Sequence, residues 1–174
     1  MQPEELKTLV QAVVREVLAR QGQAVQPAAV PASARVALGS DHGGFALKQR
    51  LKAFLDGRGY EVLDLGTPTP EACDYPDFAK AVARAVQDGS CRAGVMIDGA
   101  GIGSSMVCNK FKGIRAALCY DLKTILNSRQ HNDANVLTLG AAANPPEVVE
   151  EMVATWLATP FEGGRHQKRV DKIE

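Results

Sequence analysis

The sequence predicts an α/β fold: a three-layer α/β/α sandwich built around a five-stranded parallel sheet. From residue 35 onward, short apolar segments alternate with longer segments in which apolar residues recur at helical spacing. After each strand, the chain is therefore expected to return through a helix before the next strand begins. Connections of this kind produce a parallel sheet that helices cover on both faces.

The expected elements follow from this alternation. Strands belong where the apolar segments are shortest and bounded by turn residues, at 35–39, 61–65, 93–97, 115–119 and 135–139. Helices are expected between and after them, at 44–57, 76–88, 102–111, 121–130 and 146–158.

A different pattern occupies the N-terminus. Apolar residues at helical spacing, followed by Gly22, predict an amphipathic helix over residues 1–22. Residues 23–34 (QAVQPAAVPASA) are small and contain prolines, which is typical of a flexible linker. We therefore divide the chain into this tethered helix, the linker and one domain at 35–174. A short tethered helix needs another surface to cover its apolar stripe.

Composition excludes several classes of function. The 20 Lys and Arg residues balance 20 Asp and Glu residues, so no net charge favours nucleic acid or a membrane surface as a partner. No apolar run approaches the roughly 20 residues of a membrane span. The four cysteines lack CxxC spacing and only three histidines are present, so we expect no metal site and a reducing, cytoplasmic environment.

The first polar cluster, at 39–44, follows the first strand and contains Asp41 and His42. Ligands of open parallel sheets bind at the carboxyl ends of the strands. An Asp-His pair at that position can handle protons or hold a phosphate. The alternative is a turn in which Asp41 caps the next helix.

The second cluster follows the third strand, which ends at Asp98 and continues into a loop containing Gly99, Gly101 and Gly103. Glycines let backbone N–H groups approach an anion, and the following helix start adds partial positive charge. A carboxylate beside such a loop suggests proton transfer on a phosphorylated small molecule. The alternative is a tight turn with a capping aspartate.

Two further clusters lie near the C-terminus. Residues 128–135 (SRQHNDAN) offer donors and acceptors for sugar hydroxyls, unless they are merely an exposed helix end. Arg165, His166 and Arg169 could bring several cations to one phosphate, unless they form a solvated basic tail. All three histidines of the chain fall in these clusters, which favours an enzyme.

The clusters, in this order, resemble the ribose-5-phosphate isomerase B / galactose-6-phosphate isomerase family. The matching segments are GSDHGGFALKQRL (39–51), DLGT (64–67), DYPDFA (74–79), GAGIG (99–103), NKFKGIRAA (109–117), SRQHNDANVL (128–137) and FEGGRHQKRV (161–170). The resemblance implies a Rossmann-like domain that forms a homodimer or tetramer, with each active site built from two subunits. It also implies aldose–ketose isomerisation of a sugar phosphate through an enediolate, without a cofactor or metal.

The resemblance assigns catalytic roles to Asp98, His131 and Asp41, the last two in ring opening. It assigns substrate binding to His42, Tyr75, Gly99, Gly101, Ile102, Gly103, Asn132, Arg165 and Arg169. Within that set, the two arginines and His42 would engage phosphate and Asn132 would contact sugar hydroxyls. The N–H groups of the glycine loop would stabilise the enediolate oxygen.

Three positions depart from the family pattern. A cysteine base commonly stands where this chain has Asp98, and a hydroxyl residue where it has Ala100; some relatives place a glutamate base at the position of Ser104. We interpret Asp98 as the base that removes the C2 proton. Ribose 5-phosphate is the expected substrate, with another pentose or hexose phosphate, such as allose or galactose 6-phosphate, as the alternative. A non-catalytic sugar-phosphate-binding subunit that needs a partner is the rival interpretation.

The N-terminal helix and linker resemble the encapsulation peptides that tether enzymes to bacterial microcompartment shells. The resemblance implies a shell protein as partner of residues 1–22 and a location inside a microcompartment. Two alternatives stay open, in which the helix packs on its own domain or between subunits, or lies on a membrane surface.

Overall fold

The computed structural model describes residues 35–173 continuously. In the N-terminal segment it describes residues 2, 5, 8, 9, 11–13, 16 and 19, and those from Glu5 to Ala19 are helical. The predicted linker at 23–34 lies outside the described residues. Gln11 Nε2 donates a hydrogen bond of 3.2 Å to Glu151 Oε1, whereas Leu9 and Val13 are exposed. In the described residues, no helix has the length and apolar character needed to cross a membrane.

Five parallel strands form one sheet, as predicted, and their order is β2-β1-β3-β5-β4. The strands are β1 (Arg35–Ser40), β2 (Glu61–Asp64), β3 (Ala93–Asp98), β4 (Ala116–Leu118) and β5 (Val136–Gly140). The central strands β3 and β5 are buried throughout, whereas the edge strands β2 and β4 are partly exposed. The difference follows from their positions, because helices cover a central strand on both faces while an edge strand has one open side.

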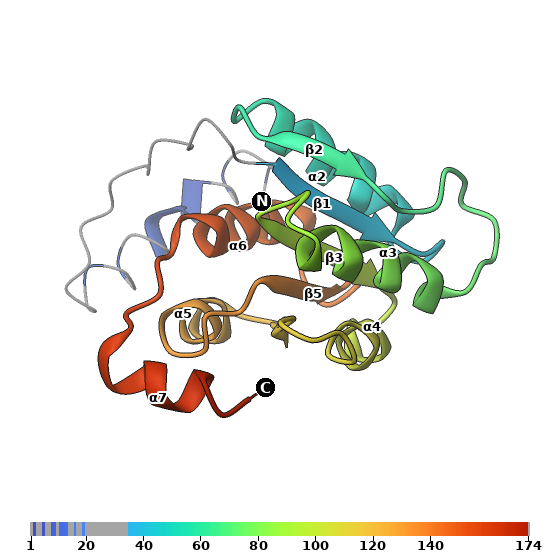
Figure 1. Cartoon of the computed structure of the whole chain (residues 1–174). Helices are drawn as coiled ribbons and strands as arrows, with labels where there is room; N and C mark the ends of the chain where they lie inside the picture. Colours follow the sequence, from blue (N-terminus) through green and yellow to red (C-terminus); the bar gives the residue numbers. More distant parts are fainter. Residues whose placement is uncertain are drawn as a thin grey trace.

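Helices cover both faces of the sheet, which confirms the three-layer prediction (Figure 1). They are α2 (Phe45–Asp56), α3 (Tyr75–Gln87), α4 (Ile102–Cys108), α5 (Leu122–Gln130), α6 (Pro146–Ala158), a 3₁₀ turn η1 (Gly164–His166) and α7 (Gln167–Val170). Apolar residues of α2, α5 and α6 form the core on one face. Those of α3 and α4 form the core on the other.

The direction of the chain gives the sheet two functionally different edges. We call the side where the strands end the carboxyl edge and the opposite side the amino edge. The chain leaves β1 for β2 on one side and later returns to β3 on the other, so the order reverses between β1 and β3. At such a reversal the connecting loops diverge and leave a crevice at the carboxyl edge, where ligands of open sheets bind.

Candidate active site

The structure brings the first two polar clusters together at this reversal. The Asp41 N–H donates to Ile97 O at 3.2 Å, which ties the end of β1 to the end of β3. Gly44 packs so closely on Ile97 that a Cβ there would lie 2.6 Å from the Ile97 carbonyl oxygen. Asp41 also accepts from the N–H of Gly44 at 3.0 Å, so it does cap the following turn.

Asp98 is a buried carboxylate whose two oxygens both accept hydrogen bonds from its own loop. Oδ1 accepts from the N–H of Ala100 at 2.8 Å and from the N–H of Gly101. Oδ2 accepts from the N–H of Ser104 at 3.1 Å and from the Ser104 hydroxyl. These four donors hold the side chain of Asp98 in one orientation at the start of the loop. Three of them are fixed by the backbone, whereas the Ser104 hydroxyl can rotate away.

This arrangement changes the expected role of the glycine loop. The N–H of Gly101, predicted to bind an enediolate oxygen, bonds to Asp98 instead. The N–H groups of Ile102 and Gly103 belong to the first turn of α4, where no intrahelical acceptor exists. An anionic substrate oxygen therefore has these two donors available, and the loop holds Asp98 as a resident anion beside them.

Backbone geometry makes two of the loop glycines necessary. Gly101 has φ 76°, a left-handed conformation that side chains disfavour, and a Cβ there would lie 2.6 Å from Leu118 Cδ1. A Cβ on Gly103 would lie 2.5 Å from Cζ of Tyr75, so the tyrosine ring covers the start of α4. On the other side, the Tyr120 hydroxyl donates to Ala100 O at 2.6 Å.

His42 is exposed at the same edge, and the loop before α3 holds its ring. Its Nδ1 lies 3.2 Å from both the N–H and the carbonyl oxygen of Cys73. Nε2 is then the nitrogen left to meet a ligand. Burial raises the pKa of the Cys108 thiol to about 12, and also raises the pKa values of Cys91 and Cys119. These three buried thiols are therefore protonated and poor bases near neutral pH.

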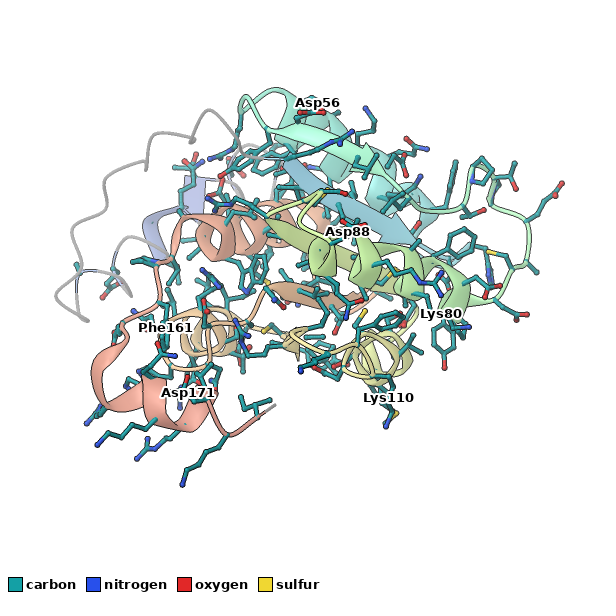
Figure 2. The ribbon with its side chains drawn as sticks, in the orientation of Figure 1. Asp56, Lys80, Asp88, Lys110, Phe161 and Asp171 are labelled. Carbon is teal, nitrogen blue, oxygen red and sulfur yellow. The ribbon has the colours of Figure 1, made fainter. Side chains whose placement is uncertain are left out.

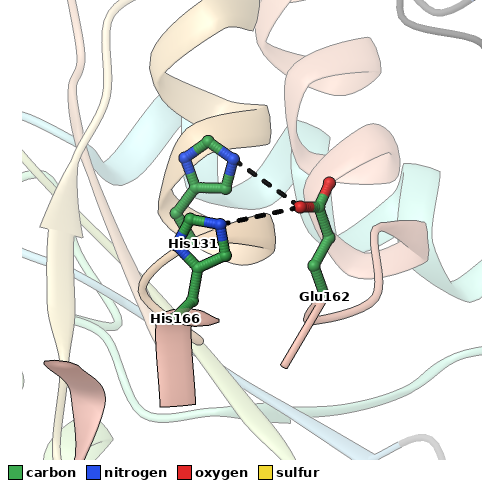
Figure 3. A group of neighbouring side chains, drawn as sticks. All are labelled: His131, Glu162 and His166. Atoms are coloured by element: carbon green, nitrogen blue, oxygen red, sulfur yellow. Dashed lines mark ion pairs between the residues drawn. The ribbon is translucent and has the colours of Figure 1, made fainter. Parts of the chain in front are cut away.

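The other two clusters meet at the amino edge. His131 follows the last residue of α5, and the Glu162 N–H donates to Gln130 O at 3.0 Å, which brings the C-terminal segment against the end of that helix. The His131 and His166 rings stack with centroids 4.2 Å apart and an interplanar angle of 4°. Nε2 of each ring lies 3.8 Å from Glu162 Oε2. Figure 3 marks these two ion pairs with dashed lines.

Cations surround this histidine pair. Arg165 Nε donates to His166 Nε2 at 3.2 Å, and Arg165 and Arg169 are both exposed. Burial, together with the charges of His131 and the two arginines, lowers the pKa of His166, while Glu162 acts in the opposite direction. The cluster is therefore a cationic surface that suits a phosphate.

His131, Glu162 and His166 also form a possible metal-binding group. Within the described part of the chain, this is the one group of histidine, cysteine or acidic residues whose possible ligand atoms all lie within 4.8 Å of one another. Imidazole binds a metal ion in the plane of its ring. The planes of His131 and His166 are nearly parallel, so their lone pairs do not converge on one ion. As arranged, the group suits proton and anion chemistry better than metal binding.

A single chain does not bring the two halves of the predicted site together. Asp98 pairs with Gly140 at the carboxyl edge, whereas β5 begins at Val136, opposite Gly94 and just after His131. The intervening four residues of strand span about 13 Å. Figure 2 shows Phe161 and Asp171 of the C-terminal segment well apart from Lys110, which follows the C-terminal end of α4.

Sequence reasoning missed three side chains that contact the predicted site. Tyr120 bonds the glycine loop, Asn127 bonds His131, and Glu162 pairs with both stacked histidines. Tyr120 and Asn127 lie outside the segments that carry the resemblance, whereas Glu162 lies inside one of them, at 161–170, without an assigned role. The contact of Asn127 with His131 could have been found from their spacing, because residues one helical turn apart have their side chains on the same face of a helix.

The fold, with polar clusters at both edges of its parallel sheet, is that of a known enzyme family. The sequence pattern of the Ribose/Galactose Isomerase family matches residues 36–173, and the chain belongs to that family. The prediction of an isomerase is thereby confirmed.

Particular relatives support this assignment. Ribose-5-phosphate isomerase B of Escherichia coli is 46% identical over 139 residues, covering 80% of this chain and 93% of its own. D-erythrulose-4-phosphate isomerase of Pectobacterium atrosepticum is 39% identical, covering 79% and 91%. The structure of Clostridium thermocellum ribose-5-phosphate isomerase B superposes with a TM-score of 0.79 at 48% identity, covering 80% of this chain and 94% of that one.

Proposed function

We propose that this chain is a sugar-phosphate aldose–ketose isomerase, with ribose 5-phosphate as the leading substrate. The observation that carries the proposal is the placement of Asp41, His42 and the Asp98 loop at the sheet reversal, in a chain of this family. An enediolate mechanism needs a base at C2 and a donor for the developing oxyanion. Asp98 supplies the base, and the first N–H groups of α4 supply the donors.

Two copies of the chain complete each site. His131, Asn132, Arg165 and Arg169 lie at the amino edge of one copy, and in the proposed assembly they face the carboxyl edge of the other. Ile102 and Met106 on α4 are 47% and 64% exposed, so an apolar surface lies beside the Asp98 loop for a partner to cover.

A mixing experiment tests the shared site. Asp98→Asn and His131→Asn homo-oligomers are each expected to be nearly inactive. After dissociation and reassociation of an equal mixture, half of the dimers are mixed, and each holds one intact site, so about one quarter of the wild-type activity returns. If activity does not recover although mixed dimers form, each site lies within one chain and this part of the proposal fails.

The substrate is tested by ketose formation across a panel of aldose phosphates. The panel contains ribose 5-phosphate, allose 6-phosphate, galactose 6-phosphate and a tetrose 4-phosphate, the last because of the erythrulose-4-phosphate isomerase relative. Turnover of ribose 5-phosphate above the others supports the proposal. Binding without turnover of any member would contradict it and favour the non-catalytic subunit.

We further propose that residues 1–22 deliver the enzyme to a microcompartment shell protein, in the cytoplasm of a bacterium. The exposed Leu9 and Val13, one helical turn apart, support an apolar face that meets a partner. The Gln11–Glu151 hydrogen bond favours the alternative, in which the helix packs on its own domain. Removing residues 1–34 should leave turnover intact and abolish co-purification with shell proteins; loss of folding or of oligomerisation would support self-packing instead.

A further inference from the structure

His131 does not stand alone on its helix end. Asn127 lies one turn earlier on α5, and its Nδ2 is 2.9 Å from His131 Nδ1. The backbone adds a second link, because the N–H of His131 donates to the Asn127 carbonyl oxygen at 3.0 Å. The position of the ring is thus set by the same residue through both its backbone and its side chain.

A third residue fixes which way the Asn127 amide points. Asn132 Nδ2 lies 3.2 Å from the Asn127 backbone oxygen and 3.1 Å from Asn127 Oδ1. A backbone carbonyl can only accept, so the Asn132 atom facing it must be the amide nitrogen. The Asn127 atom that meets the same nitrogen is then its oxygen, which leaves the NH₂ group of Asn127 toward His131.

An NH₂ group beside Nδ1 requires that nitrogen to accept a hydrogen bond. A neutral imidazole with an accepting Nδ1 carries its proton on Nε2. A neutral ring with its proton on Nδ1 would instead place two donors against each other at 2.9 Å. The series of hydrogen bonds from Asn132 through Asn127 to His131 therefore determines the tautomer of the His131 ring.

We propose that Asn127 is a positioning residue that holds neutral His131 with its proton on Nε2, so that His131 acts on the substrate as a hydrogen-bond donor. This inference rests on the proposed function, in which His131 assists opening of the sugar ring. There the Nε2–H polarises the ring oxygen, as neutral imidazoles polarise substrate oxygens in other enzymes.

The surroundings of Nε2 leave its proton available. Glu162 Oε2 lies 3.8 Å away, too far for a hydrogen bond. The nitrogen of the stacked ring, His166 Nε2, already accepts from Arg165. The side chain of His131 is 36% exposed, so an incoming sugar oxygen can reach the proton without displacing another group.

Substitution of Asn127 by aspartate tests the proposal with almost no change of shape. A carboxylate can only accept, so Nδ1 of His131 must then carry the proton and Nε2 becomes an acceptor. Nitrogen-15 spectra of the histidine rings report this directly, since the chain has only three histidines. At about pH 9, where unpaired imidazoles are neutral, we expect an Nε2–H ring for His131 in the wild type and an Nδ1–H ring in Asn127→Asp.

The kinetic counterpart uses two substrates. Ribose 5-phosphate is cyclic, whereas a tetrose 4-phosphate cannot close a furanose ring because its C4 oxygen is esterified. Asn127→Asp should lower kcat for ribose 5-phosphate by about 10²-fold and change kcat for the tetrose by less than about twofold. Gln87→Glu, the same amide-to-carboxylate change on an exposed part of α3, is the matched control and should alter neither.

Three results would overturn the proposal. A wild-type His131 protonated on Nδ1 contradicts the tautomer, even if the variant fails to fold. An unchanged tautomer in Asn127→Asp shows that another group sets it, and equal losses with both substrates exclude a role in ring opening. The spectra also separate this proposal from the proposed function, because they give the tautomer whether or not the wild type turns over either sugar.

Discussion

Replacing Asp98 with asparagine removes the proposed base while keeping the shape of the side chain. In the folded protein the carboxylate accepts from the N–H groups of Ala100, Gly101 and Ser104, and from the Ser104 hydroxyl. The asparagine oxygen can keep the first two bonds. Its NH₂ group must then face the Ser104 N–H, which loses its acceptor.

The structure allows the two consequences of this change to be estimated separately. A buried, unsatisfied N–H costs about 1–3 kcal/mol, and loss of charge from the remaining bonds adds about 1 kcal/mol, so we expect destabilisation of about 2–4 kcal/mol. Loss of a general base lowers kcat by about 10²–10⁴-fold. The two effects are distinguishable because the first appears in the free energy of unfolding and the second in turnover of the folded fraction.

The assay combines urea denaturation with turnover in deuterium oxide, where an enediolate route introduces deuterium into the product. Ser104→Ala is the matched control, because it removes a donor from the same carboxylate but leaves the base in place. We expect it to cost about 1 kcal/mol and to retain most of the turnover. An Asp98→Asn enzyme with wild-type kcat on a confirmed substrate would refute the assignment of Asp98 as base and leave it as a capping residue.

Three further predictions address other parts of the site. With a thiol reagent near pH 8, Cys73 should react first and Cys108 only on unfolding, because burial raises the pKa of the Cys108 thiol to about 12. Mass spectrometry of the labelled peptides measures the order of reaction, and early labelling of Cys108 would contradict its burial. Because the pKa of His166 is lowered in the folded state, the unfolded chain takes up this proton first as the pH falls. The free energy of unfolding should therefore fall as the pH drops through and below 6.5. His166→Gln should lose less stability than the wild type between about pH 7.5 and 5.5, and an equal loss would count against this cause. Arg169→Ala should raise KM for a sugar phosphate by about tenfold or more with a smaller effect on kcat, and a KM within twofold of the wild type would remove Arg169 from phosphate binding.

Most of the fold follows from the sequence because each strand and helix carries its own local pattern. The five strands and five of the helices lie within a few residues of their predicted positions. The helix expected at 102–111 ends at Cys108 instead, because Asn109 turns its side chain to bond both the N–H and the carbonyl oxygen of Ala116. That contact joins residues whose pairing depends on tertiary packing, which a periodicity does not record.

The candidate site was predictable in its residues but not in its connections. Asp41, Asp98 and His131 carry recognisable chemistry at strand or helix ends, so the sequence singles them out as candidates, and their roles stay predictions. Asp98 accepts from the N–H of Ser104 in the first turn of α4, as its alternative interpretation described, whereas Asp41 bonds the N–H of Gly44 in the turn before α2 and does not cap that helix. The orientation of a ring by an amide, as in Asn127 with His131, depends on side-chain rotamers that no motif encodes.

The placement of complementary half-sites on opposite edges of one sheet has a consequence for concentration. In the proposed shared site, no chain is a complete catalyst alone, so the number of working sites follows the association equilibrium between copies. Below the dissociation constant of the pair, the rate falls with the square of the protein concentration, although every chain stays folded. Confinement of many copies in a small volume would then switch the enzyme on by mass action, and dilution would switch it off without any inhibitor.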